Sequence, residues 1–143
     1  DYYQALKDNG ITVGQGNGSV QNAVVAGEKA CGLLADYMAI RSKNDGAPVE
    51  FVYPAEGSPA VTEPIGIVNG TENEDLAKAF VDFVLSEEGQ ALTAEIGYTP
   101  VKSGVAVPEG FKSIDEITPL SWDTEELYQN READKAQFSQ MFQ

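Results

Sequence analysis

Histidine is absent from this 143-residue chain, and cysteine occurs once, at Cys31. Without histidine no Ser–His or Cys–His couple can form, and the usual proton carrier near neutral pH is missing. A zinc site made of cysteine and histidine is likewise excluded within the chain, whereas a metal site with oxygen ligands is not. Because Cys31 lies in an apolar run from Ala30 to Leu34, we expect a buried, unreactive thiol.

Basic residues are also scarce, since 9 Lys and Arg stand against 23 Asp and Glu and give a net charge of −14. A field of this sign repels phosphate backbones, so we expect no nucleic-acid partner. The chain also lacks a run of 18 apolar residues, the length that a membrane-spanning helix needs. Low cysteine content fits the cytoplasm and fits an exported bacterial protein equally well, so it does not decide the compartment.

What the chain does contain is an alternation of two periodicities. Apolar, β-prone runs predict strands at 11–13, 31–34, 49–53 and 65–68. Helical spacing predicts helices at 1–9, 19–28 and 36–44, two more between Glu74 and Gly97, and a last one after residues 123–126. This alternation favours an α/β fold with a parallel sheet, in which ligands gather at the carboxyl ends of strands.

A glycine-rich turn at 14–19 leaves the first expected strand. Its glycines permit positive φ and close backbone approach, and the helix behind it directs free N–H groups outward. Asn17, Gly18 and Ser19 therefore form a candidate site for an anionic or carboxylate group. The spacing departs from G-x-G-x-x-G, which argues against a dinucleotide. A tight connecting turn without a ligand is the alternative.

Two more candidate positions follow. Asp36 and Tyr37 end the second expected strand, where a carboxylate and a phenol can bind a solute, stack on it or coordinate a hard metal. Equally, Asp36 can cap its helix while Tyr37 packs against the sheet. Gly57 and Ser58 lie in a connection between two expected strands, which suits either a crossover lining a cleft or an ordinary loop.

Taken in order, these segments resemble the carboxyl-terminal half of a periplasmic-type (type 2) solute-binding protein of an ABC importer. More narrowly, they are similar to the group that binds ferric ion, thiamine, polyamines and phosphonates. The segments that carry the likeness are VQNAVVAGE at 20–28, GLLADY at 32–37, VYPAEGSP at 52–59, EPIGIV at 63–68, AKAFVDFVLSEEGQ at 77–90 and GYTPV at 97–101.

The resemblance implies a periplasmic-binding-protein-like α/β fold, with a mixed sheet flanked by helices and two lobes joined by a hinge. Residues 1–60 would belong to the second lobe, 61–117 to the first, and 118–143 to the second again. It also implies that the chain is a fragment, whose missing amino-terminal portion holds most of the first lobe and the signal peptide. The implied protein is periplasmic or extracellular, captures a small molecule or ion without a cofactor, and delivers it to an ABC permease in the membrane.

The ligand-binding positions that the resemblance implies are Asn17, Gly18, Ser19, Asp36, Tyr37, Gly57 and Ser58, with no catalytic residue and no metal ligand among them. Ferric-binding members carry adjacent tyrosines where this chain has Tyr37 and Met38. A thioether is a poor ligand for ferric iron, so this departure favours an organic or oxyanion solute.

Apolar faces left uncovered by the missing half favour self-association of the piece. Two other functions stay open. One is the ligand-sensing effector domain of a transcription regulator, since some of these share the two-lobed plan. The other is a small enzyme that uses paired carboxylates.

Overall fold

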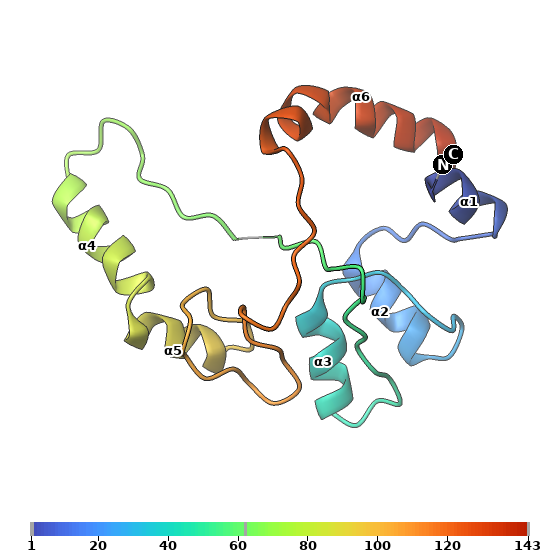
Figure 1. Cartoon of the computed structure of the whole chain (residues 1–143), viewed down its shortest axis with the longest axis horizontal. Coiled ribbons are helices and arrows are strands. Elements are labelled where there is room, and N and C mark those ends of the chain that lie inside the picture. Colours follow the sequence, from blue (N-terminus) through green and yellow to red (C-terminus); the bar gives the residue numbers. More distant parts are fainter. Residues whose placement is uncertain (1, 62, 143) are drawn as a thin grey trace. The chain divides into compact units, whose positions relative to one another are not determined.

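The computed structural model describes residues 2–61 and 63–142. Within these ranges the chain forms six α-helices (Figure 1). They are α1 (Tyr2–Asp8), α2 (Asn17–Val25), α3 (Asp36–Asn44), α4 (Glu74–Val84), α5 (Glu87–Glu95) and α6 (Thr124–Phe142). Each predicted helix is confirmed, although α2 begins and ends earlier than its apolar spacing indicates, and Asp1 lies outside the described residues.

The mixed sheet is wrong for this structure, because none of the runs 11–13, 31–34, 49–53 and 65–68 forms a strand in the described chain. Side chains expected inside a sheet are exposed instead: Leu33 by 71%, Val52 by 74% and Val68 by 77%. A strand needs a neighbouring extended segment with which it exchanges backbone hydrogen bonds. The β propensity of a run indicates only that it suits such a surface, and it does not supply the neighbour.

One isolated parallel bridge, between Ser58 and Pro119, is the remnant of sheet-like pairing in the described residues. The amide of Ser58 donates to the carbonyl of Thr118 at 2.8 Å, and the amide of Leu120 donates to the carbonyl of Ser58 at 2.9 Å. Two segments about sixty residues apart are thereby held together.

The chain divides into two compact units, a terminal unit (Asp1–Leu33 and Ser121–Gln143) and a central unit (Leu34–Leu120). The assignment of 1–60, 61–117 and 118–143 to lobes stays a prediction. In the terminal unit α1 packs on α6, where the rings of Tyr3 and Phe138 meet edge to face with centroids 6.0 Å apart.

Two expectations about burial in the terminal unit are wrong. The spacing of Leu127, Ala136, Phe138, Met141 and Phe142 predicts a buried side for the last helix, but no described residue of α6 is buried. Cys31 is exposed rather than buried, because the run that holds it has no sheet to enter.

The central unit contains the buried residues. Ala39 and Ile40 of α3 form its apolar core, and Gln90 of α5 and Pro100 are buried as well. The corner between α4 and α5 is formed by Ser86, the N-cap of α5, whose hydroxyl donates to the carbonyl of Phe83 at 2.6 Å and accepts from the amide of Gly89 at 3.1 Å. A serine N-cap of this kind satisfies a helix amide that would otherwise lack a partner.

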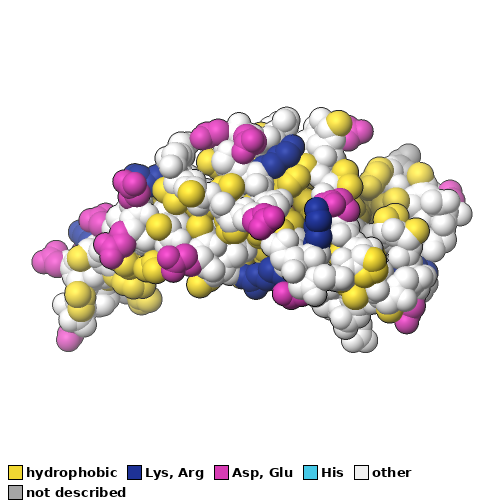
Figure 2. All heavy atoms as spheres, turned by 90° about the horizontal axis from the view of Figure 1, so that it is seen from below, with side chains coloured by type: hydrophobic (Ala, Val, Ile, Leu, Met, Phe, Trp, Pro, Cys, Tyr) yellow, Lys and Arg dark blue, Asp and Glu magenta, His cyan; other side chains and the backbone are white. Residues whose placement is uncertain are grey.

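One face of α4 carries large apolar side chains at helical spacing. Leu76 is 71% exposed, Phe80 59% and Phe83 41%. Figure 2 shows apolar side chains interspersed with acidic ones on the surface that it views. An amphipathic helix is ordinarily stabilised by burying this face, so the α4 face is a surface available to another apolar surface.

Candidate ligand-binding site

Asp36 and Tyr37 open α3, as the sequence predicts. Ala35 is the N-cap, and Asp36 is the first helical residue. Its Oδ1 accepts a hydrogen bond from the Tyr37 amide at 2.8 Å, while its Oδ2 lies 3.4 Å from the hydroxyl of Tyr53. A carboxylate in the first turn of a helix is stabilised by the positive end of the helix dipole. Asp36 therefore presents a negative charge beside the phenol of Tyr53.

Tyr53 ties this carboxylate to the segment around Lys112. The Lys112 amide nitrogen lies 3.4 Å from the Tyr53 hydroxyl, and the Lys112 Nζ lies 5.0 Å from the centre of the Tyr53 ring. The Phe51 ring packs edge to face against the Tyr53 ring, with the two centroids 4.8 Å apart. Partial burial raises the pKa of Tyr53 above its ordinary value, with a smaller contribution from Asp36. Tyr53 is therefore a neutral phenol, able to donate to an acceptor, at neutral pH.

Tyr37 packs against Tyr98 rather than against a sheet. The two ring centroids are 4.9 Å apart at an interplanar angle of 41°. The guanidinium carbon of Arg41 lies 5.1 Å from the Tyr37 centroid and 5.7 Å from that of Tyr98. The phenol of Tyr98, followed by partial burial, raises the pKa of Tyr37, and Arg41 opposes that shift. The result is an aromatic pair with a cation over it.

Gly57 and Ser58 have a role in chain pairing. Gly57 has φ +122°, and a Cβ there would lie 3.0 Å from Leu120 Cδ2 and 3.1 Å from the Thr118 carbonyl oxygen. Glycine is therefore required by both backbone conformation and space. Among the described residues, no hydrogen bond or ring contact joins Gly57 or Ser58 to Asp36 or Tyr37.

The glycine-rich turn also differs from expectation. None of Gly14, Gly16 and Gly18 has φ in the left-handed region, and Gly16, at φ 162° and ψ 177°, is extended, so this turn does not use the left-handed conformation that glycine permits. Gly14 lies close to Ser19, and a Cβ there would lie 2.6 Å from Ser19 Oγ, so a larger residue would have to turn the serine side chain that bonds Gly16.

The start of α2 nevertheless keeps the feature on which the anion hypothesis depends. Asn17 and Gly18 are its first residues, and Ser19 donates from Oγ to the Gly16 carbonyl at 2.8 Å. Amides in a first helical turn are suited to hold an anion. Binding there stays a prediction. These three residues belong to the terminal unit, whereas Asp36, Tyr37, Gly57 and Ser58 belong to the central unit.

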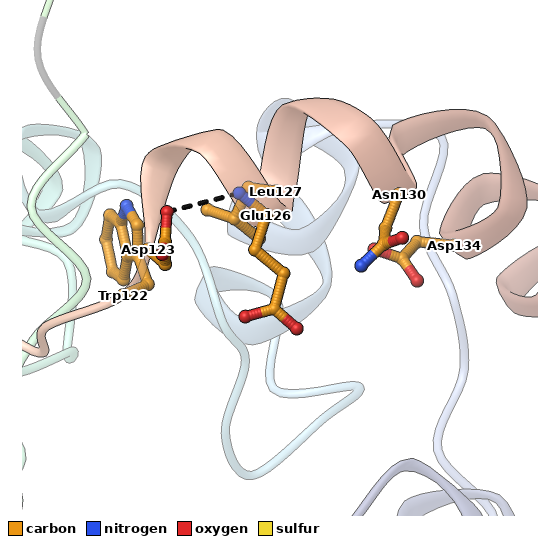
Figure 3. A pocket seen from close by; sticks show the side chains of 6 residues that line it. All are labelled: Trp122, Asp123, Glu126, Leu127, Asn130 and Asp134. Carbon is orange, nitrogen blue, oxygen red and sulfur yellow. Dashed lines mark hydrogen bonds between the residues drawn. The ribbon is translucent and has the colours of Figure 1, made fainter.

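A shallow hollow along the start of α6 is lined by Trp122, Asp123, Glu126, Leu127, Asn130 and Asp134 (Figure 3). Asp123 is already engaged, since its Oδ1 accepts from the amides of Glu125 and Glu126 at 2.9 and 3.2 Å. The hollow thus contains a helix cap and a solvated acidic face. No group of three or more His, Cys, Asp or Glu side chains suited to a metal ion occurs in the described part of the chain.

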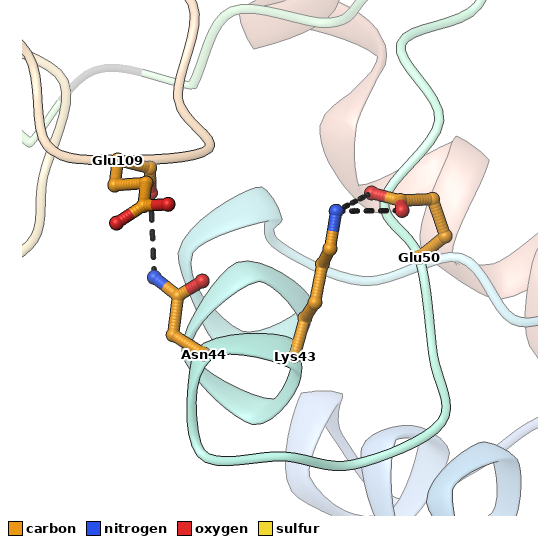
Figure 4. A network of polar contacts seen from close by, with 4 residues as sticks. All are labelled: Lys43, Asn44, Glu50 and Glu109. Carbon is orange, nitrogen blue, oxygen red and sulfur yellow. Dashed lines mark hydrogen bonds and ion pairs between the residues drawn. The ribbon is translucent and has the colours of Figure 1, made fainter.

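Polar contacts at the carboxyl end of α3 are structural. Lys43 Nζ pairs with both oxygens of Glu50 at 2.7 and 2.8 Å, and Asn44 donates to the carbonyl of Glu109 at 3.3 Å (Figure 4). The hydrogen bond from Lys43 lowers the pKa of Glu50. Both ion-pair partners are exposed, so the pair adds little stability.

Sequence reasoning missed Arg41, Tyr53 and Tyr98 as neighbours of Asp36 and Tyr37, and Lys112 as a neighbour of Tyr53. Arg41 was accessible to it, because residues i and i+4 share one face of a helix and Tyr37 stands four residues before Arg41. Tyr53, Tyr98 and Lys112 approach from segments 16 or more residues away, and no local pattern indicates that proximity.

Residues 1–119 match the model of the bacterial extracellular solute-binding protein family, so the chain belongs to that family. A protein of Haemophilus influenzae, described as uncharacterized, is 44% identical to it over 66 residues. That alignment covers 46% of this chain and 18% of the relative, so the matched segment spans less than a fifth of the relative's length. No solved structure matches the chain. In the part of the chain that the structure describes, no helix is both long enough and apolar enough to cross a membrane.

Proposed function

We propose that this chain is the carboxyl-terminal portion of the solute-binding component of an ABC importer. The protein captures a small solute between two lobes in the periplasm or extracellular space and delivers it to a membrane permease without catalysing a reaction. The observation that carries the proposal is the family match over residues 1–119. A moving clamp of this kind is a known form of hinge closure.

The first turn of α3 supports a ligand-binding role. The Asp36 carboxylate, which accepts from the Tyr37 amide, meets the half-buried phenol of Tyr53 from another segment, and half-buried Tyr37 follows Asp36 in the chain. Phenols offer both a hydrogen-bonding hydroxyl and an apolar ring, so such a set recognises an organic solute by shape and polarity together. Asn17, Gly18 and Ser19 at the start of α2, and Gly57 and Ser58 at the crossover, are proposed as further ligand positions.

The solute is proposed to be organic or an oxyanion rather than ferric iron. Ferric iron prefers oxygen donors, and the residue after Tyr37 is Met38. Tyr37 is also already packed against Tyr98. The group that binds ferric ion, thiamine, polyamines and phosphonates supplies the candidates.

The test is a thermal-unfolding screen of the complete gene product that contains this chain. The probes are ferric citrate, thiamine, spermidine, agmatine, 2-aminoethylphosphonate and phosphate. A ligand present at about 100 times its Kd stabilises the folded protein by about 2.7 kcal/mol, which raises the melting temperature by several degrees. We expect a rise with an organic or oxyanion probe and none with ferric citrate. A complete protein that responds to no probe contradicts the proposal.

Matched variants test whether the ligand-induced rise in melting temperature depends on the residues at the start of α3. Tyr37→Phe and Asp36→Asn remove the hydroxyl and the charge at the start of α3, and each is expected to abolish the shift given by the active probe. Tyr128→Phe makes the same chemical change as Tyr37→Phe on an exposed tyrosine of α6 and should leave the shift unchanged. Equal loss in Tyr37→Phe and Tyr128→Phe would remove Tyr37 from the site.

A further inference from the structure

The carboxyl end of α5 is a negative helix terminus without a basic residue of its own. No Lys or Arg lies in its last turn. The chain turns away at Gly97, with φ +84°, immediately after Ile96. Carbonyl groups at such an end lack intrahelical partners and carry the negative end of the helix dipole, so they attract a cation. A positive group from elsewhere is therefore favoured at this point.

Arg41 of α3 supplies that group. Its Nη2 donates a hydrogen bond to the carbonyl oxygen of Ile96. Gly97 makes the approach possible, because a Cβ at this position would lie 2.8 Å from both Nε and Nη2 of Arg41. The guanidinium thus occupies the space beside Gly97 that the Cβ of any other residue would enter.

The same guanidinium lies over an aromatic pair. Its central carbon is 5.1 Å from the ring centre of Tyr37 and 5.7 Å from that of Tyr98. Ring faces attract cations within about 6 Å, and a planar guanidinium stacks on them better than an ammonium does. Glu63 lies near enough to act on Tyr37 electrostatically, which adds a carboxylate to the surroundings.

The parts of this arrangement differ in exposure. Tyr37 and Tyr98 are half-buried and held against each other, whereas Arg41 is exposed. The aromatic pair is thus the more buried side of this contact, and the Arg41 side chain is an occupant that solvent reaches. Replacing the occupant requires rotation of one long side chain and no opening of the core.

We propose that Tyr37, Tyr98 and the carboxyl end of α5 form a binding site for a guanidinium group, occupied by Arg41 in the free protein and by the guanidinium of a solute when one is bound. Arg41 then acts as an internal competitor. A solute must displace it, so only a group with the same planar charge and hydrogen-bonding pattern does so. The proposal rests on the proposed function in that Tyr37 faces the solute.

The test is chemical rescue of the full chain with methylguanidinium chloride. Arg41→Ala empties the site and is expected to lower the melting temperature by about 4 °C, a shift typical of losing one such contact in a small domain. Millimolar methylguanidinium should restore at least half of that loss and perturb tyrosine absorbance. Urea, which is similar in shape but neutral, should restore none at the same concentration.

Two variants serve as controls. Lys43→Ala removes another exposed cation of α3, one that pairs with Glu50, and its melting temperature should not respond to methylguanidinium. The double variant Arg41→Ala/Tyr98→Ala lacks half of the aromatic pair and should not be rescued. If Arg41→Ala does not fold, Arg41→Gln replaces it, because glutamine keeps much of the side-chain length and removes the charge.

The proposed guanidinium site is contradicted if methylguanidinium raises the melting temperature equally in Arg41→Ala and Lys43→Ala. It is also contradicted if urea and methylguanidinium rescue Arg41→Ala equally. This experiment needs no solute. If Arg41→Ala is rescued but the protein responds to no probe in the ligand screen, the guanidinium site is supported and the transport function is contradicted. If the protein responds to a probe but Arg41→Ala is not rescued, the transport function is supported and the guanidinium site is contradicted.

Discussion

The side chain of Gln90 holds the main chain of Val101, since its Oε1 accepts a hydrogen bond from the Val101 amide at 2.7 Å. The same side chain donates from Nε2 to the carbonyl of Val84 at 2.8 Å. Gln90 is buried, and both ends of its amide are therefore satisfied by backbone groups. One residue of α5 thus connects the end of α4 with the segment that follows Gly97, and this connection fixes the surroundings of Tyr98.

Replacing Gln90 by Ala is expected to destabilise the central unit. The change removes two hydrogen bonds, to the Val101 amide and the Val84 carbonyl, each contributing about 0.5–1.5 kcal/mol, and leaves a cavity where the buried glutamine stood. Gln129→Ala is the matched control, because Gln129 makes an exposed side-chain hydrogen bond to Glu125 on α6. Urea unfolding should show a loss for Gln90→Ala and a change within about 0.5 kcal/mol for Gln129→Ala. Equal losses would show that burial of Gln90 has no special value.

Alanine should have opposite effects at two helical glycines. A Cβ on Gly89 would overlap the carbonyl oxygen of Phe83 and lie 2.9 Å from that of Val84, whereas a Cβ on Gly18 would meet nothing within 4 Å. Gly89→Ala is expected to destabilise by about 1–3 kcal/mol. Gly18→Ala is expected to stabilise by about 0.5 kcal/mol, because alanine loses less backbone entropy on folding. Denaturant unfolding followed by far-UV circular dichroism measures both, and a gain at Gly89 would contradict the close approach.

Stability should fall on both sides of neutral pH. The pKa of Glu50 is lowered by Lys43 and that of Glu116 by Ser113, so their contribution is present above the ordinary glutamate pKa of about 4.3 and is lost as pH falls through the lowered values. The pKa values of Tyr37 and Tyr53 are raised, so their contribution is present below the ordinary tyrosine pKa of about 10 and is lost as pH rises through the raised values.

The melting temperature measured as a function of pH shows both losses of stability, the one at acid pH (the acid limb) and the one at alkaline pH (the alkaline limb). In Glu50→Gln the acid limb should become shallower, because the group that titrates is gone, and in Tyr37→Phe the alkaline limb should do so. An acid limb that is unchanged in Glu50→Gln would mean that Lys43 does not perturb this carboxyl in the folded protein.

The exposed face of α4 predicts association of the chain with itself. Leu76, Phe80 and Phe83 form an apolar stripe, and burying one phenylalanine contributes about 1.5–3 kcal/mol. Sedimentation velocity should show a larger species as concentration rises, and Phe80→Ser should weaken this association at least about tenfold, the equivalent of 1.4 kcal/mol. Asp82→Ser changes another face of α4 and should have no such effect. A chain that stays monomeric at high concentration would contradict this use of the face.

Helices could be predicted from the sequence because their determinants are local. Ser86, Asp123 and the apolar spacing of α4 each act within a few residues, and the structure confirms helices at all of these places. Strands could not be predicted in this way. The runs 49–53 and 65–68 show only a β propensity, and strand pairing depends on a neighbouring extended segment from elsewhere in the chain. The expected sheet failed for that reason.

The candidate site divides in the same way. The position of Asp36 and Tyr37 at the start of a helix follows from the residues around them. Their neighbours Tyr53 and Tyr98 come from distant segments, which the local pattern does not specify. The left-handed glycine conformation expected in the turn at 14–19 is absent there, because the turn enters α2 through Gly16 in an extended conformation.

The exposure of Cys31 gives the molecule a natural attachment point. Because it is the sole thiol in the sequence, a maleimide dye reacts at one known position without any engineered mutation. That position belongs to the terminal unit, so the fluorescence of such a conjugate follows the unfolding of that unit by itself.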